Sequence, residues 1–96
     1  MTLNFTETYR TAAISINHLN DMDQILLKKM MEGPTSLVAE RPAGYFIKLH
    51  KNAERNAHDG LTKGLQTILV SAAKQGFECI EVDLDAVELN GAATYN

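Results

Sequence analysis

The sequence predicts an α+β domain in which the elements follow the order strand, helix, strand, strand, helix, strand. Apolar and polar residues alternate with a period of two in residues 12–18 and 79–85, which is typical of half-buried strands. Apolar residues recur every three or four positions in 21–32 and 60–75, which indicates amphipathic helices. With each helix as a crossover, this order favours the split βαβ, or ferredoxin-like, sandwich, with both helices on one face of an antiparallel sheet.

The first half of this pattern starts with a strand at Ala12–His18. Asn20 is a favourable helix N-cap, and two carboxylates follow in the first helical turn, where they meet the positive end of the helix dipole. The helix should therefore span Asp21–Glu32. Gly33 and Pro34 are expected to end it.

The second half contains a hairpin, a helix and a last strand. We expect strands at Leu37–Glu40 and Tyr45–His50 around a Pro-Gly turn, a helix at Gly60–Gln75, and a strand at Cys79–Asp85. In the last strand Ile80, Val82 and Leu84 should face the core. Residues 12–87 then form one domain, with residues 1–11 as a flexible N-terminal arm and 88–96 as a C-terminal tail.

Composition limits the classes of function. The chain has 96 residues, 45% of them hydrophobic, and a formal net charge of −3. Direct nucleic-acid binding is not expected, because neutralising phosphates requires a basic surface. Cys79 is the single cysteine, so no intrachain disulfide can form and a reducing, cytoplasmic location is expected. The longest apolar runs are too short to cross a membrane, and no motif for a cofactor is present.

Three carboxylates alternate along the last strand and should share one face. Glu81, Asp83 and Asp85 could contact a basic surface of a partner protein. The alternative is a solvated sheet face, or an edge strand protected by charge.

A second polar group lies where the first strand meets the first helix. His18, Asp21 and Asp23 could form a metal or acid–base cluster, since a carboxylate can orient an imidazole. The alternative is structural, with the two aspartates capping the helix and His18 hydrogen-bonded at the strand end. No residue has the sequence context of a catalytic nucleophile, and no metal site is expected.

The first helix carries more apolar residues than packing against a sheet requires. Leu27 and Met31 are the surplus, and they could form a patch for another protein or for a second copy of this chain, as in a homodimer. The alternative is that the N-terminal arm covers them.

Three segments of the chain form a recognisable pattern: Ser15-x-x-His18-Leu19-x-x-x-Asp23-x-Ile25-Leu26-Leu27, Gly44-Tyr45-Phe46-Ile47-Lys48-Leu49 and Gly76-Phe77-x-x-Ile80-x-Val82-Asp83-x-Asp85. This pattern resembles a family of uncharacterised small proteins and domains. Members of that family are carried by bacterial plasmids and integrated mobile elements, near anti-restriction and toxin–antitoxin genes. The resemblance implies the same setting, and it marks Ser15, His18, Asp23, Asp83 and Asp85 as pattern positions. The chain lacks the Trp-containing end that the family tends to carry.

Together these features predict a non-catalytic protein-binding module of a bacterial mobile element. Its expected role is to inhibit a host defence system, of the anti-CRISPR or anti-restriction type, by covering a basic or apolar surface of its target. Two alternatives stay open: a small metal-dependent enzyme or sensor centred on His18, Asp21 and Asp23, and an antitoxin-like partner of a toxin.

Overall fold

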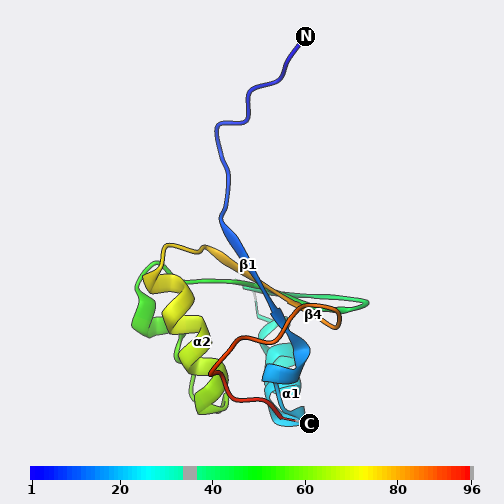
Figure 1. The fold of residues 1–96 in the computed structure, drawn as a ribbon. Helices are drawn as coiled ribbons and strands as arrows, with labels where there is room; N and C mark the ends of the chain where they lie inside the picture. Colours follow the sequence, from blue (N-terminus) through cyan, green and yellow to red (C-terminus); the bar gives the residue numbers. More distant parts are fainter. Residues whose placement is uncertain (34–36, 96) are drawn as a thin grey trace.

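The chain folds into a four-stranded sheet with two helices packed against one of its faces (Figure 1). This computed structural model describes residues 1–33 and 37–95. The predicted α+β class and the predicted order of the elements are confirmed. The elements are β1 (Thr11–Ser15), the 3-10 helix η1 (Ile16–His18), α1 (Asp21–Met30), β2 (Val38–Arg41), β3 (Gly44–Lys48), the 3-10 helix η2 (Ala53–Asn56), α2 (Lys63–Lys74) and β4 (Cys79–Asp83).

The sheet is mixed, so the fully antiparallel ferredoxin-like sheet expected from the sequence is wrong. The strand order is β1-β4-β3-β2, with β4 parallel to β1 and antiparallel to β3. The reason lies in the connection after β3. Lys48 at the end of β3 pairs with Cys79 at the start of β4. Residues 49–62 first carry the chain to the opposite end of the sheet, where Thr62 bonds to Asp23, and α2 then returns it. Because residues 49–62 and α2 each cross the length of the sheet, β4 starts at the end of the sheet where β3 stopped, and the two strands run antiparallel.

Three strands end earlier than predicted: β3 ends at Lys48 rather than His50, and β1 and β4 are each shortened by a side chain that captures the backbone. The hydroxyl of Ser15 accepts a hydrogen bond from the Asn17 amide at 3.1 Å, which starts η1 in place of the last residues of the predicted strand. The carboxylate of Asp83 accepts one from the Asp85 amide at 2.8 Å and turns the chain out of β4. Leu84, expected in the core, is therefore 65% exposed.

The helices begin where polar side chains cap them. Helix α1 starts as predicted after Asn20, and it ends at Met30, two residues before the predicted end. Pro34, expected to help end it, lies outside the described residues. Helix α2 starts at Lys63, three residues later than predicted, because the hydroxyl of Thr62 accepts from the Leu65 amide at 3.2 Å. Gly76 follows α2 with a φ of +88°, as expected of a left-handed C-terminal glycine.

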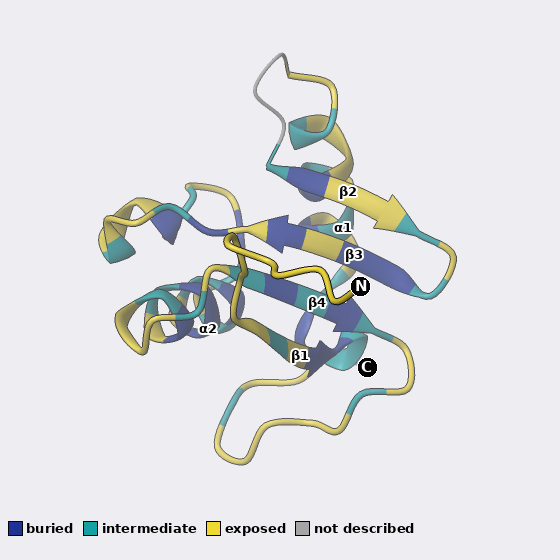
Figure 2. Cartoon of the chain, turned by 90° about the horizontal axis from the view of Figure 1, so that it is seen from above, coloured by how far each residue is buried: buried dark blue, intermediate teal, exposed yellow. Residues whose placement is uncertain are grey.

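The core lies between the inner face of the sheet and the two helices. Figure 2 shows the sheet from its other side, with buried and exposed residues alternating along β3. Both layers contribute to one hydrophobic cluster. Its members are Ile14, Leu19, Leu27, Val38, Tyr45, Ile47, Leu49, Leu61, Leu65, Ile68, Leu69, Ala72, Ile80 and Val82.

The apolar patch expected on the back of the first helix is not a surface. Leu27 has no exposed area and belongs to the core, and Met31 is half-buried and packs against that core. The side of α1 that carries Leu27 and Met31 therefore faces the core. The large apolar side chains that α1 exposes are Met22 and Ile25.

The two ends of the chain differ in how they relate to the body of the domain. Residues 1–10 have no secondary structure, and they project from the start of β1 away from the body (Figure 1). Residues 84–95 instead return past β1 and lie against η1, where the amide of Tyr95 donates to the carbonyl of Asn17 at 2.7 Å.

Gly44 allows a test of the sheet, since the backbone of β4 occupies the place that a side chain at this position of β3 would need. A Cβ atom placed on Gly44 would lie 1.9 Å from the carbonyl oxygen of Val82. We expect Gly44→Ala to lower the free energy of unfolding by about 2–3 kcal/mol, because backbone atoms must move apart. Chemical denaturation measures this loss. Gly33→Ala is the control, with its nearest atom at 3.8 Å and an expected change within about 0.5 kcal/mol. Equal stability of the two variants would contradict the close approach.

Candidate functional site

The three polar residues at the start of the family pattern are all buried. Ser15, His18 and Asp23 are at most 2% exposed, and each is hydrogen-bonded within the chain. No buried side-chain nitrogen or oxygen in the described part of the chain lacks a hydrogen-bond partner. These residues therefore hold segments of the fold together.

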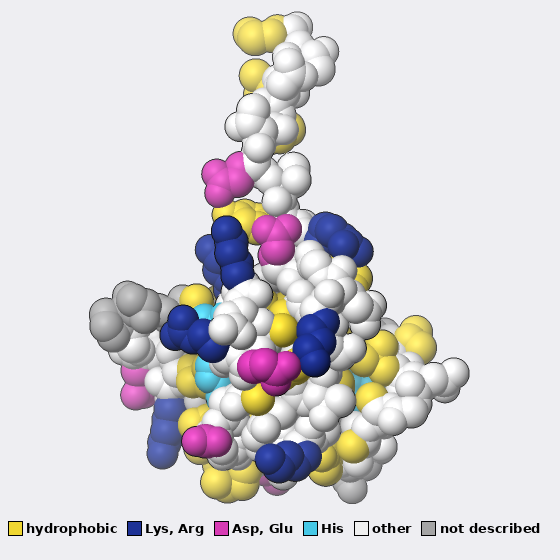
Figure 3. Space-filling model, turned by 90° about the vertical axis from the view of Figure 1, so that its left-hand side faces the viewer, with side chains coloured by type: hydrophobic (Ala, Val, Ile, Leu, Met, Phe, Trp, Pro, Cys, Tyr) yellow, Lys and Arg dark blue, Asp and Glu magenta, His cyan; other side chains and the backbone are white. Residues whose placement is uncertain are grey.

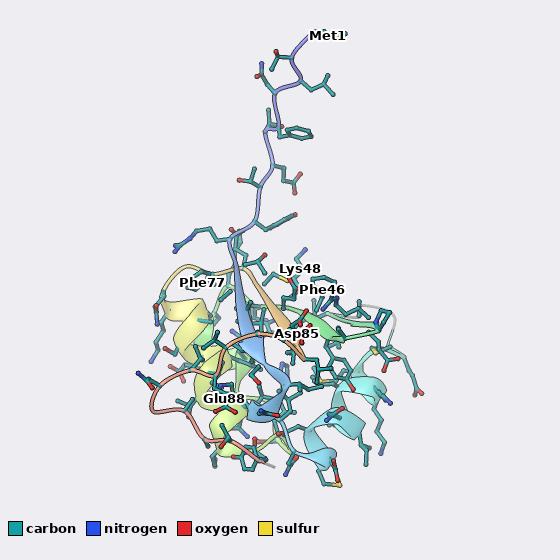
Figure 4. The ribbon with its side chains drawn as sticks, turned by 45° about the vertical axis from the view of Figure 1, so that its right-hand side comes forward. Met1, Phe46, Lys48, Phe77, Asp85 and Glu88 are labelled. Carbon is teal, nitrogen blue, oxygen red and sulfur yellow. The ribbon has the colours of Figure 1, made fainter. Side chains whose placement is uncertain are left out.

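His18 fastens the C-terminal tail to the body. Its Nδ1 lies 2.7 Å from the carbonyl oxygen of Ala93, and its Nε2 accepts a hydrogen bond from the Leu89 amide at 2.9 Å. A carbonyl can only accept and an amide N–H can only donate, so the ring is neutral with its proton on Nδ1. Next to it, the Asn17 side-chain amide donates to Glu88 at 2.8 Å, and Figure 4 shows Glu88 on the tail.

Asp23 caps the starts of both helices. It forms a capping box with Asn20, in which the Asp23 amide donates to the Asn20 side chain at 2.7 Å and the Asp23 carboxylate accepts from the Asn20 amide at 3.0 Å. The same carboxylate accepts from the amide and the hydroxyl of Thr62, at 2.7 and 2.8 Å. Asp23 therefore caps the helix, which is the structural alternative considered for it above. Its bond to Thr62 could not be foreseen, because 39 residues separate the two.

The proposed cluster of His18, Asp21 and Asp23 does not form a metal-binding group. Both ring nitrogens of His18 bond to the tail, and Asp21 is exposed on the first turn of α1. Among residues 1–33 and 37–95, no three His, Cys, Asp or Glu side chains are grouped so that they could hold a metal ion.

Two further histidines and one asparagine lie together in the loop between β3 and α2. The rings of His50 and His58 lie 5.6 Å apart. Burial, and then the charge of His50, lower the pKa of His58 from its ordinary value. Buried Asn56 accepts from the His50 amide at 2.9 Å and donates to the carbonyls of His50 and Ala53, so it shapes the loop that carries both histidines. Only its burial distinguishes it from the other asparagines.

Within the part of the chain that the structure describes, no helix or strand covers the face of the sheet opposite α1 and α2 (Figure 2). Phe46 lies on it from the central strand β3 and is 39% exposed, and Lys48 lies beside it on the same strand (Figure 4). Phe46 is paired across to Glu81 of β4. Figure 2 shows this open face with the arm in front of it.

Arg41 connects the carboxylates of this face. From the end of β2, its guanidinium pairs with Asp83 and lies 3.3 Å from Glu81, and its Cζ lies 5.6 Å from the centre of the Phe46 ring. Of the three predicted acidic residues, Glu81 and Asp83 therefore share a face as expected, and both are already paired. Asp85 lies past the end of β4 and is exposed, so the strand does not carry three aligned carboxylates. No pattern in the sequence indicated the role of Arg41.

The electrostatics of Asp83 follow from these contacts. The hydrogen bond from the Asp85 amide, and then the one from Arg41, hold the pKa of the Asp83 carboxyl below its ordinary value. The fold thus favours the charged form of Asp83, which keeps the pairing with Arg41 at neutral pH.

Fold and site together define a two-layer α+β domain with one open sheet face, in which the buried residues Ser15, His18 and Asp23 are structural. Residues 11–96 match the DUF5983 C-terminal domain, a family of unknown function, and the chain belongs to that family. The comparisons with curated proteins and with solved structures gave no match. No helix in the described residues is long and apolar enough to span a membrane.

The link between His18 and the tail can be tested directly. We expect His18→Ala to free the tail, since the Leu89 amide and the Ala93 carbonyl lose their partners, and to cost about 1–3 kcal/mol of stability. Amide hydrogen exchange should show faster exchange at Leu89 with continued protection of β3 and β4. His50→Ala is the control, because the contacts of His50 are with Asn56 and His58. Unchanged exchange at Leu89 in His18→Ala would refute the assignment.

The pairing of Asp83 predicts a pH dependence with a definite sign. Because its folded pKa is lowered, its contribution to stability is present above the ordinary carboxyl range and is lost as the pH falls through the folded value. In Arg41→Gln the pKa of Asp83 should rise, though the bond from the Asp85 amide should keep it below the ordinary value. NMR titration of the carboxyl carbon measures the pKa of Asp83 in the wild type and in the variant. Lys28→Gln, which removes the ion pair with Glu40 instead, should leave Asp83 unchanged.

Proposed function

We propose that this chain is a protein-binding module that uses the open face of its sheet. The observation that carries the proposal is the exposed ring of Phe46 on the central part of that face, next to paired charges. A large aromatic side chain surrounded by polar groups is a common energetic centre of protein interfaces.

The charges around Phe46 support a partner of mixed character. Arg41 and Lys48 supply two positive charges, and Glu81 and Asp83 supply two negative ones. Arg41 pairs with both carboxylates, and Lys48 supplies the second positive charge, so the face is balanced and does not require a strongly basic target. A partner with an apolar centre for Phe46 and a polar rim fits it best.

More specifically, we propose that binding through the open face inhibits a target protein, which is the role expected from the family resemblance. In this role the domain would act by covering a surface that its target needs. The setting in a bacterial mobile element, and a target among host defence proteins, stay parts of the proposal. An antitoxin would also act by covering a surface of its toxin, so the identity of the partner decides between the two roles.

The test compares two exposed apolar residues replaced by the same charged residue. Phe46→Glu changes the open face, and Ile25→Glu changes the exposed side of α1, where 48% of Ile25 is accessible. Tagged wild type and both variants, each shown to be folded by circular dichroism, are used as baits in lysate of the bacterial host. A partner that the wild type retains in stoichiometric amount is then purified, and its affinity for each chain is measured by calorimetry.

We expect Phe46→Glu to weaken binding at least about 30-fold, because a charge would be buried against the partner, and Ile25→Glu to change it by less than about 3-fold. If both variants bind like the wild type, the open face is not the interface. If Ile25→Glu alone loses the partner, the interface lies on the helix layer and the proposal fails.

A further inference from the structure

We propose that the arm, residues 1–10, lies along the free edge of β1 in a second copy of this chain, so that two copies exchange arms. This goes beyond the proposed function, since it rests on different residues and a different part of the sheet. In the exchange, Leu3 and Phe5 of one copy occupy a cleft beside β1 of the other.

The arm has the properties of a strand without a partner. Figure 3 shows it standing clear of the body, with hydrophobic side chains along it. Leu3 is 69% exposed and Phe5 is 82% exposed. They alternate with Thr2, Asn4 and Thr6, so an extended arm presents its apolar residues on one side. Two such side chains in water favour any arrangement that buries them.

The sheet offers an edge that can receive a strand. β1 is the outer strand and pairs only with β4 among the described elements. In a parallel pair, alternate residues of β1 bond to β4, and the remaining N–H and C=O groups point outward. An extended segment next to Thr11–Ile14 would complete them, as in other cases of strand addition.

A cleft of about 480 Å³ opens beside this edge, between β1, α2 and the tail. Its walls are mostly apolar, and its apolar residues include Ala12, Ile14, Ile68, Ala72, Leu89 and Ala92. The cleft therefore matches the arm in chemistry as well as in position.

The arm cannot readily reach the edge of its own β1. It would have to reverse direction at Tyr9 and Arg10, and neither residue favours the positive φ values of a tight hairpin turn. Arg10 is also fixed in line with β1. Its carbonyl accepts from the amides of Glu78 and Cys79, at 2.8 and 3.2 Å, and its guanidinium lies 4.5 Å from the centre of the Phe77 ring.

A second copy removes this difficulty, because its arm approaches from outside without a turn. Residues 1–9, fully extended, span about 30 Å, which exceeds the length of β1. Two-fold symmetry would let each arm bind the other copy in the same way, which closes the assembly at two chains.

Sedimentation of the full chain over a wide range of concentrations tests the proposal. We expect a dimer that dissociates on dilution. Leu3→Asp with Phe5→Asp should weaken dimerisation at least about 10-fold, since two charges would enter the cleft. The matched control is Asn4→Asp with Thr6→Asp, which adds the same charge to the other side of the arm and should keep the dimer. A wild type that is monomeric at all concentrations, or a dimer that survives the Leu3 and Phe5 changes, would overturn the proposal.

A disulfide experiment identifies the position of the arm. In a Cys79→Ser background, one chain carries Phe5→Cys and another carries Ser71→Cys, which lies on α2 in the wall of the cleft. Mixing the two and oxidising them should give a covalent heterodimer. The double variant on one chain should likewise give covalent dimers. If it gives only a cross-linked monomer, the arm folds back on its own chain and the exchange is refuted. All these variants keep Phe46, Arg41 and Glu81 of the open face, so failure here leaves the binding proposal standing, and the reverse is also true.

Discussion

The carboxylate of Asp23 is the contact on which the arrangement of the helix layer depends. Three donors from two segments meet on one buried side chain: the Asn20 amide, the Thr62 amide and the Thr62 hydroxyl. A carboxylate at the positive ends of two helices is stabilised by both dipoles as well as by these bonds. Because α1 begins there, α2 must begin there too. The chain leaving β3 is thus required to travel along the sheet before α2 can form.

This requirement explains which parts of the fold the sequence could predict. The helices and strands were recognised because their side chains repeat with the periods of local geometry. The boundaries moved wherever one hydroxyl or carboxylate captured a nearby amide, as Ser15, Thr62 and Asp83 do. The order of the strands depends instead on the path of residues 49–62. That path follows from the contact between Thr62 and Asp23, which no local pattern contains.

In the candidate site too, roles that depend on neighbouring residues could be predicted, whereas roles that depend on distant segments could not. The role of Asp23 as a cap was readable from Asn20, three residues before it, whereas the role of His18 required the position of Leu89 and Ala93. Burial decided between the functional and the structural interpretation in both cases. A neutral ring with both nitrogens engaged has no free position for a ligand. Ser15, His18 and Asp23 therefore have structural roles, because their hydrogen bonds hold segments of the chain together. The exposed candidate for binding a partner is Phe46, which belongs to an apolar segment of the same pattern.

The two proposed surfaces meet at the base of the arm. Lys48, on the open face, places its Nζ 5.4 Å from the centre of the Tyr9 ring, at the point where the arm leaves β1. A partner that covers Phe46 would come close to Lys48, and an arm bound to a second copy would hold Tyr9 in a defined position. The two events thus share one cation–π contact, worth about 0.5–1 kcal/mol at an exposed site. A coupling of that size changes an affinity by only a few-fold, so the edge of β1 and the open face can act as largely independent surfaces of one sheet.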